Sequence, residues 1–144
     1  MLARRALTRH ELKDRLRKKK FSHQEVETVV ADIAAEGYID EKGIVEDYIR
    51  LGKEFRLVGR FFLLQQLKHR GIEEIVIQDL LDEHYPKEDE NPIALEFATK
   101  KLQTLGGVEK IKKIRRLGGA LSQRGFSSGI IHQVLGQLDL DDED

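Results

Sequence analysis

The stretch 67-LKHRGI-72 lies near the middle of the chain and returns twice, as 121-LSQRGF-126 and, less perfectly, as 16-LRKKKF-21. The copies are 51 and 54 residues apart, a spacing close to that of helical repeat units. Four residues before each first leucine stands another leucine, so each pair lies on one face of a helix. These pairs are Leu12 with Leu16, Leu63 with Leu67, and Leu117 with Leu121. The recurrence predicts one structural unit used three times.

Each hexamer predicts the joint between two helices. Gly71 and Gly125 lie just past the first helix, where a left-handed conformation is easy for glycine. Lys20 holds that position in the first copy, so that turn is either strained or follows another path. The second helix of each copy keeps apolar residues at fixed intervals. They are Val26, Val29 and Val30; Ile77, Leu80 and Leu81; and Ile131, Val134 and Leu135.

Helix starts are marked by capping patterns. Leu7-Thr8 with Glu11-Leu12, and Phe21-Ser22 with Glu25-Val26, each form a capping box inside a hydrophobic staple.

A longer helix precedes each pair of short helices. Asp40 caps one that carries Ile44, Val45, Tyr48, Ile49 and Phe55 on one side, and Asn91-Pro92 opens another that ends at Gly106-Gly107. In the last repeat an apolar stripe is expected through Val108, Ile111, Ile114 and Leu117, with Gly118 and Gly119 approached closely by a neighbouring helix.

These patterns predict an all-α fold, an elongated, curved array of three tandem three-helix repeats. The predicted repeats are residues 1–38, 39–88 and 89–138, followed by an acidic tail at 139–144. Only MLARRA precedes Leu7, so the first helix of the first repeat is expected to be cut short. Stacking of neighbouring repeats would bury the apolar face that a unit of about 50 residues cannot cover alone.

The composition excludes several classes of protein. The chain has 144 residues, 40% hydrophobic and 35% charged, and no cysteine, which rules out disulfides and thiolate metal sites. No apolar run is long enough to cross a bilayer and the start lacks the apolar block of a secretory signal, so a cytoplasmic protein is expected.

The residues that could carry catalysis or bind a metal show no such pattern. The five histidines show no metal-ligand spacing, and the acidic stretch 86-PKEDENP-92 is more typical of a loop between helices. No nucleotide-binding or nucleophile motif is present. We therefore predict a protein that is not an enzyme and has no cofactor.

Charge is strongly segregated, although the net charge is only −1. Residues 1–20 hold nine Lys or Arg, and residues 100–124 hold eight. Such strips suit a phosphate backbone or an acidic protein groove, although charged helix faces often serve only solvation. The predicted partner-binding residues are Arg9, Lys13, Arg17, Lys19, Lys68, Arg70, Lys110, Lys113, Arg116 and Arg124. Because Phe21, Tyr48, Phe97 and Phe126 are expected in the core, few aromatics remain for base stacking, and only weak, non-specific nucleic-acid contact is expected.

The order and spacing of these motifs resemble a known family. L-x-x-x-L-x-x-R-G-F, Glu11-Leu12 to Leu16, 37-GYID-40 and 59-GRFFLLQQLKHRGI-72 together resemble RecX, the bacterial regulator of the RecA recombinase, from about Leu2 to Leu138. The resemblance implies three tandem three-helix repeats and a monomer that binds the groove of the RecA filament on single-stranded DNA. It also implies inhibition of strand exchange, ATP hydrolysis and coprotease action, with no catalytic residue. Lys20 stands where the family usually has glycine.

Two other functions fit the same residues. The short helix pairs joined at Gly71 and Gly125 have the sequence pattern of a helix-turn-helix DNA-binding protein, which would prefer a duplex sequence. Stacked helices with basic strips also fit a scaffold that binds some other acidic protein.

Overall fold

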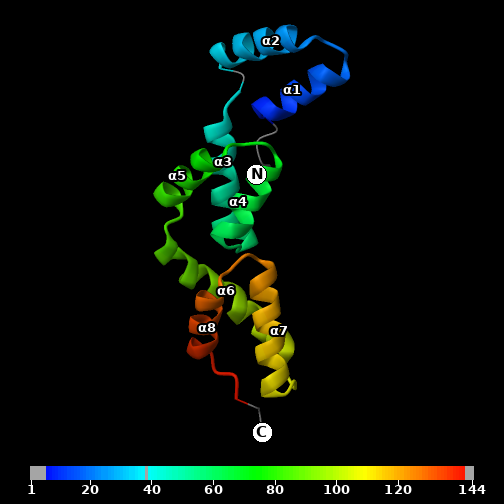
Figure 1. The fold of residues 1–144 in the computed structure, drawn as a ribbon. Coiled ribbons are helices and arrows are strands. Elements are labelled where there is room, and N and C mark those ends of the chain that lie inside the picture. The colour runs from blue at the N-terminus through cyan, green and yellow to red at the C-terminus, as the bar shows by residue number, and fades with distance from the viewer. Residues whose placement is uncertain (1–5, 38, 142–144) are drawn as a thin grey trace. The chain divides into compact units, whose positions relative to one another are not determined.

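The structure is a computed structural model that describes residues 6–37 and 39–141. Within those ranges the regular structure is entirely helical, which confirms the all-α prediction (Figure 1). The α-helices are α1 (Arg9–Lys18), α2 (His23–Ala35), α3 (Glu41–Leu51), α4 (Arg60–His69), α5 (Glu74–His84), α6 (Glu90–Leu102), α7 (Lys110–Gln123) and α8 (Ser128–Gln137). A π-helical turn η1 (Gly52–Arg56) follows α3, and the 3-10 turns η2 (Lys87–Asp89) and η3 (Gln103–Leu105) flank α6.

The chain forms two compact units. The first comprises Met1–Ile49 and Leu64–His84, and the second comprises Arg50–Leu63 and Tyr85–Asp144. The chain passes between the units three times, within α3, within α4 and directly after α5. The three predicted repeat boundaries are a separate division and stay a prediction. The expected shortening of the first helix falls mainly on residues 1–5, and the end of the acidic tail on residues 142–144, all outside the described residues.

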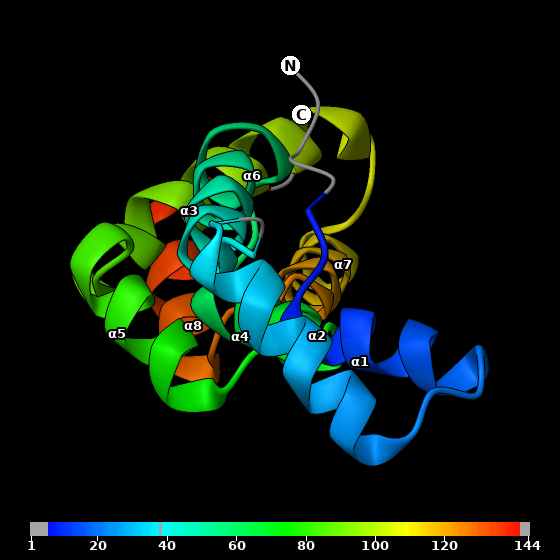
Figure 2. The same ribbon diagram turned by 90° about the horizontal axis from the view of Figure 1, so that it is seen from above.

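The first unit has an apolar core that follows the predicted helical faces. In it α1 and α2 pack against each other as a helical pair (Figure 2). Apart from Val29, which is half-buried, the apolar positions predicted for α2 and α5 are buried. The buried apolar residues of this unit are Val26, Val30, Ile44, Val45, Ile49, Leu64, Leu67, Ile72, Ile77, Leu80 and Leu81.

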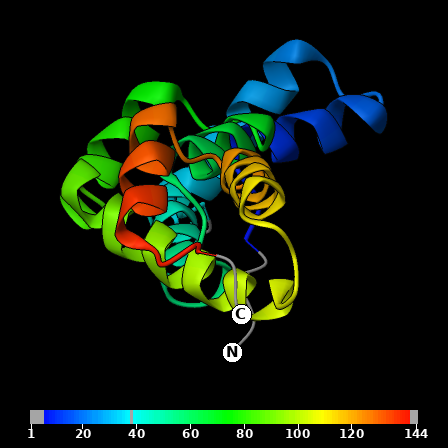
Figure 3. The ribbon, with the colours of Figure 1, turned by 90° about the horizontal axis from the view of Figure 1, so that it is seen from below.

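The second unit has its main core between α6, α7 and α8, which pack against one another (Figure 3). The members of that core are Ala94, Ala98, Leu105, Leu117, Leu121, Phe126, Val134 and Leu140. Leu140 lies beyond the last helix, so the start of the acidic tail is anchored by an apolar side chain.

All three joints have the same backbone conformation. Gly71 and Gly125 have φ values of 89° and 83°, and Lys20 has a φ of 67°. In each joint the N–H of the sixth residue donates to the carbonyl of the first, over 3.3, 3.2 and 3.2 Å in chain order. The N–H of the fifth residue donates to the carbonyl of the second, over 2.9, 2.9 and 3.0 Å. This pair of bonds is the Schellman ending of a helix, which requires a left-handed fifth residue. Lys20 therefore accepts the strained conformation.

Both predicted capping boxes are confirmed. The Thr8 hydroxyl accepts a hydrogen bond from the N–H of Glu11 over 3.1 Å, and the Glu11 carboxylate accepts one from the N–H of Thr8 over 2.9 Å. Ser22 and Glu25 make the same pair of bonds over 3.1 and 3.0 Å. Each box satisfies N–H groups that have no partner within the helix.

The long helices begin close to their predicted starts. The Asp40 carboxylate accepts a hydrogen bond from the N–H of Gly43 over 2.9 Å, as expected of a cap. Helix α6 begins at Glu90, two residues before the predicted position of Pro92. Pro92 still lies in the first turn, where its missing N–H costs no helical hydrogen bond.

Two aromatic residues predicted in the core are exposed. Phe55 is 70% exposed because η1 is π-helical, and its wider turn rotates Phe55 off the face that Ile44, Val45 and Ile49 bury. Phe21 is 43% exposed. Helix α1 has no fully buried residue, so its pairing with α2 makes too small a core to enclose the Phe21 ring.

The predicted apolar stripe of α7 is confirmed at Leu117 and wrong at two other positions. Ile111 is 75% exposed and Ile114 is 37% exposed, whereas Lys113 is buried. The break at Gly106-Gly107 starts a new helix whose inner face repeats every four residues, through Lys113, Leu117 and Leu121. No close approach explains the glycines in α7. A Cβ on Gly118 would meet only Ile131 at 3.9 Å, and one on Gly119 would meet nothing within 4 Å.

Candidate partner-binding surface

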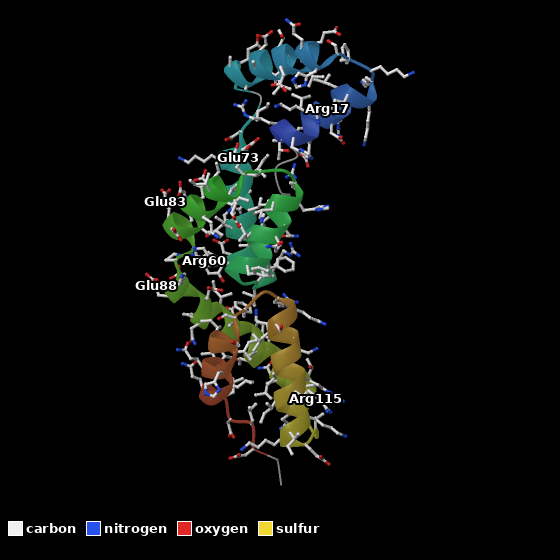
Figure 4. The ribbon with its side chains drawn as sticks, viewed as in Figure 1. Arg17, Arg60, Glu73, Glu83, Glu88 and Arg115 are labelled. Carbon is white, nitrogen blue, oxygen red and sulfur yellow. The ribbon has the colours of Figure 1, made fainter. Side chains whose placement is uncertain are left out.

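Helix α1 presents most of the basic residues predicted near the N-terminus. Arg9, Arg17 and Lys19 are exposed, and none of their side chains has a carboxylate partner among the described residues, although the backbone N–H of Arg9 donates to the Glu41 carboxylate over 2.9 Å. Lys13 is half-buried, with its Nζ 3.2 Å from the carboxylate of Glu27 on α2. Figure 4 shows Arg17 on this helix. Because unpaired surface cations keep their full attraction for an anionic partner, α1 is a candidate docking surface for such a partner.

Helix α7 is the second basic surface and carries five Lys or Arg and no acidic residue. Arg116 is exposed and has no carboxylate partner in the described part of the chain. Lys110 is exposed, but its Nζ lies 3.2 Å from the carboxylate of Asp141. Lys112 and Arg115, which the predicted set omitted, are also exposed, and Figure 4 shows Arg115 on this helix. Their place in the same basic run was the signal for including them.

Two other residues predicted to bind a partner, Lys68 and Lys113, fit an exposed basic surface less well. Lys68, at the end of α4, is exposed, and its Nζ lies 3.5 Å from the carboxylate of Glu74 on α5. An exposed pair of this length contributes little, so Lys68 remains available to a partner. Lys113 is only 4% exposed, so its stem packs in the second unit and we leave it out of the surface.

Arg70 was predicted to bind a partner, and the structure gives it internal contacts instead. Its Nη2 and Nε donate to the two carboxylate oxygens of Glu11 over 2.7 and 3.0 Å. The same Nη2 donates to the carbonyl of Ala6 over 2.8 Å, and the guanidinium lies 5.7 Å from the ring centre of Tyr48. The hydrogen bonds from Arg70 lower the pKa of Glu11, and those same bonds raise the pKa of Arg70. Arg70 is therefore structural.

Arg124 is placed in the same way in the second unit. Its Nη1 donates to the carbonyl of Arg56, and its guanidinium lies 4.2 Å from the ring centre of Phe97. Burial, and then the charge of Arg56, lower the pKa of Arg124. The charged hydrogen bond and the ring hold this half-buried side chain against η1 and α6, so we also leave Arg124 out of the proposed surface.

The backbone of both arginines contacts the start of a helix about 60 residues earlier. The Thr8 hydroxyl, just before α1, donates to the carbonyl of Arg70 over 2.8 Å. The Gly59 N–H, just before α4, donates to the carbonyl of Arg124 over 2.7 Å. We call the pairs Arg70-Gly71 and Arg124-Gly125 the Arg–Gly junctions. Each one joins the start of a helix in one predicted repeat to the joint of the next.

Besides the positive φ, close packing also requires glycine at Gly71 and Gly125. A Cβ on Gly71 would collide with the side chain of His10, and one on Gly125 would lie 2.5 Å from the backbone nitrogen of Phe62. In the first joint, by contrast, Lys19 and Lys20 are exposed and no such contact is formed within the described residues. The first joint can therefore carry lysines where the other two need arginine and glycine.

Two polar side chains of the second unit, Tyr85 and Glu90, make structural bonds. The Tyr85 hydroxyl donates to the carbonyl of Val58 over 2.8 Å, and burial raises the pKa of Tyr85. The Glu90 carboxylate accepts a hydrogen bond from the N–H of Arg60 over 3.3 Å, and burial raises the pKa of Glu90. Among the described residues no three His, Asp or Glu side chains are grouped to hold a metal ion. No helix in the same ranges is long and apolar enough to cross a membrane.

Two family models match the two ends of the chain. The first three-helix domain of RecX matches residues 1–32, and the third three-helix domain of RecX matches residues 88–135. Together they cover more than half of the sequence. The chain belongs to the RecX family. Among RecX relatives, the regulatory protein RecX of Amycolatopsis mediterranei is 28% identical over 135 residues, covering 94% of this chain and 77% of that protein. The regulatory protein RecX of Streptomyces lividans is 28% identical over 130 residues, covering 90% of this chain and 69% of that protein.

RecX crystal structures share the fold. RecX from Lactobacillus salivarius superposes with a TM-score of 0.82 at 22% identity, covering 96% of this chain and 90% of that one. A second crystal structure of a regulatory protein RecX superposes with a TM-score of 0.76 at 22% identity, covering 89% of this chain and 64% of that one. The fold of tandem three-helix domains is thus that of the RecX family.

Proposed function

We propose that this RecX-family protein binds the RecA filament on single-stranded DNA and lowers its recombinase, ATPase and coprotease activities. The observation that carries the proposal is family membership, because the regulatory proteins RecX are its relatives along nearly the whole chain. In the cell this function belongs to the control of DNA repair, recombination and the SOS response, and it takes place in the cytoplasm.

The exposed cations of α1 and α7 support this proposal. In each helix several basic side chains face solvent without a carboxylate partner among the residues that the structure describes. A nucleoprotein filament offers both phosphates and acidic side chains, and complementary charge speeds the encounter and fixes its register. The residues of the proposed surface are Arg9, Lys13, Arg17, Lys19, Lys68, Lys110, Lys112, Arg115 and Arg116.

Co-sedimentation with RecA filaments tests the proposal. Filaments are assembled on single-stranded DNA with a slowly hydrolysed ATP analogue, and the bound protein is measured at rising salt. We expect Arg115→Glu with Arg116→Glu to weaken binding by about tenfold at low salt, because each change replaces an attraction with a repulsion. The charge-matched control is Lys42→Glu with Lys87→Glu, two exposed lysines outside α1 and α7.

Two results would count against the proposal. Absence of filament binding by the wild-type protein would contradict it outright. Equal losses in the two double variants would show that binding follows net charge rather than α7. Selective binding to one duplex sequence without RecA would instead support the helix-turn-helix alternative.

A further inference from the structure

The first joint differs from the other two in its last residue. Ile72 and Phe126 end their joints as buried side chains, 3% and 4% exposed, whereas Phe21 is 43% exposed. Beside Phe21 lies a surface hollow of about 380 Å³. Its lining residues are Phe21, Ser22, Gln24, Glu25, Thr28 and Val29. The ring therefore stands on the surface, at the edge of an open space and at the end of the run Arg17–Lys20.

We propose that the first joint is a binding site for single-stranded nucleic acid, with the Phe21 ring stacked on a base and Arg17, Lys19 and Lys20 holding the phosphates. An exposed ring beside several cations matches what an unpaired strand offers, namely base faces alternating with negative charges. In a duplex the base faces are covered by their neighbours, so the ring would gain nothing there. The site does not depend on RecA.

The charges around Phe21 favour an anionic ligand. Arg17, Lys19 and Lys20 are exposed and have no carboxylate partner in the described ranges. Lys18, in the same run, has its Nζ 3.2 Å from the carboxylate of Asp14. The one acidic residue of the hollow, Glu25, accepts the Ser22 N–H over 3.0 Å, so its charge serves the start of α2.

The first joint also differs from the other two at its fifth residue. Lys20 holds a φ of 67°, a conformation that costs an L-residue about 1–2 kcal/mol and that glycine adopts freely in the other two joints. Among the described residues nothing corresponding to the Arg–Gly contacts covers the first joint, so its cations and its ring are open to a ligand there.

Fluorescence anisotropy with two labelled strands tests the site. One strand is a 20-residue oligothymidine, and the other is an abasic strand of the same length, which keeps the phosphates and lacks the bases. We expect Phe21→Leu, which keeps an apolar side chain and removes the ring, to weaken oligothymidine binding by about tenfold. The same variant should bind the abasic strand like the wild type. The matched control is Phe55→Ala, which removes a more exposed ring from the second unit and should change neither affinity.

The salt dependence tests the cations. Lys19→Gln with Lys20→Gln should weaken binding to both strands and reduce the slope of log K against log salt by about 1.4, since each phosphate contact on a single strand contributes about 0.7. Circular dichroism confirms that the variants fold. Wild-type affinity in Phe21→Leu, equal losses on the two strands, or equal competition by a duplex would each overturn the proposal.

Discussion

Lys20 is the only non-glycine residue at the fifth position of the three joints, and its φ of 67° is left-handed. Lys20→Gly removes a cost of about 1–2 kcal/mol for an L-residue in that conformation. Glycine also lowers the stability by about 0.5–1 kcal/mol, because the unfolded chain with glycine has more conformational freedom to lose on folding. We therefore expect the substitution to stabilise the joint between α1 and α2 by about 0.5–1 kcal/mol.

Hydrogen exchange of the Phe21 amide measures this gain where it arises. That amide donates to the carbonyl of Leu16 over 3.3 Å, so it exchanges only when the joint opens. The control is Lys20→Ala, which removes the same charge and keeps the strained backbone. We expect protection to be about two to five times higher in Lys20→Gly than in Lys20→Ala. Equal or lower protection in Lys20→Gly would refute the account of the first joint as strained.

Three further substitutions test the fold. In urea unfolding, Gly107→Ala should cost about 1 kcal/mol and Gly71→Ala at least twice as much, because both have positive φ but only Gly71 faces His10; equal losses would contradict the close approach. The pKa of Glu11 is lowered in the folded state, so its contribution to stability is complete above its ordinary value of 4.5 and is lost as the pH falls through the folded pKa. Glu11→Gln should therefore flatten the loss of stability below about pH 4.5, and an unchanged pH profile would count against that ion pair. Gly119→Ala should stabilise α7 by about 1 kcal/mol, since its Cβ meets nothing within 4 Å; destabilisation would reveal a contact that the structure does not show.

The helical joints could be predicted from the sequence because their determinants are local. The positive φ of Gly71 and Gly125, the capping boxes at Thr8 and Ser22, and the buried second helices all depend on residues within a few positions of one another. Such short-range patterns survive in any tertiary context that keeps the helices.

The roles of the arginines could not be predicted in that way. Arg70 bonds to Glu11 and Ala6, 59 and 64 residues earlier in the chain, and helical periodicity contains no information about that distance. A signal was nevertheless present, because the same arginine recurs before both glycines. A residue that only binds a partner has no reason to recur at the same position of each structural repeat. The outward turn of Phe55 depends on a π-helical turn that the apolar pattern does not encode.

The inhibition of RecA's ATPase tests the central claim most directly. RecA is saturated with single-stranded DNA, ATP is regenerated, and the purified protein is added at a concentration equal to that of RecA. The account predicts a lower steady-state rate of ATP hydrolysis, with weaker inhibition by the α7 variant Arg115→Glu with Arg116→Glu. An unchanged rate with the wild-type protein would contradict it.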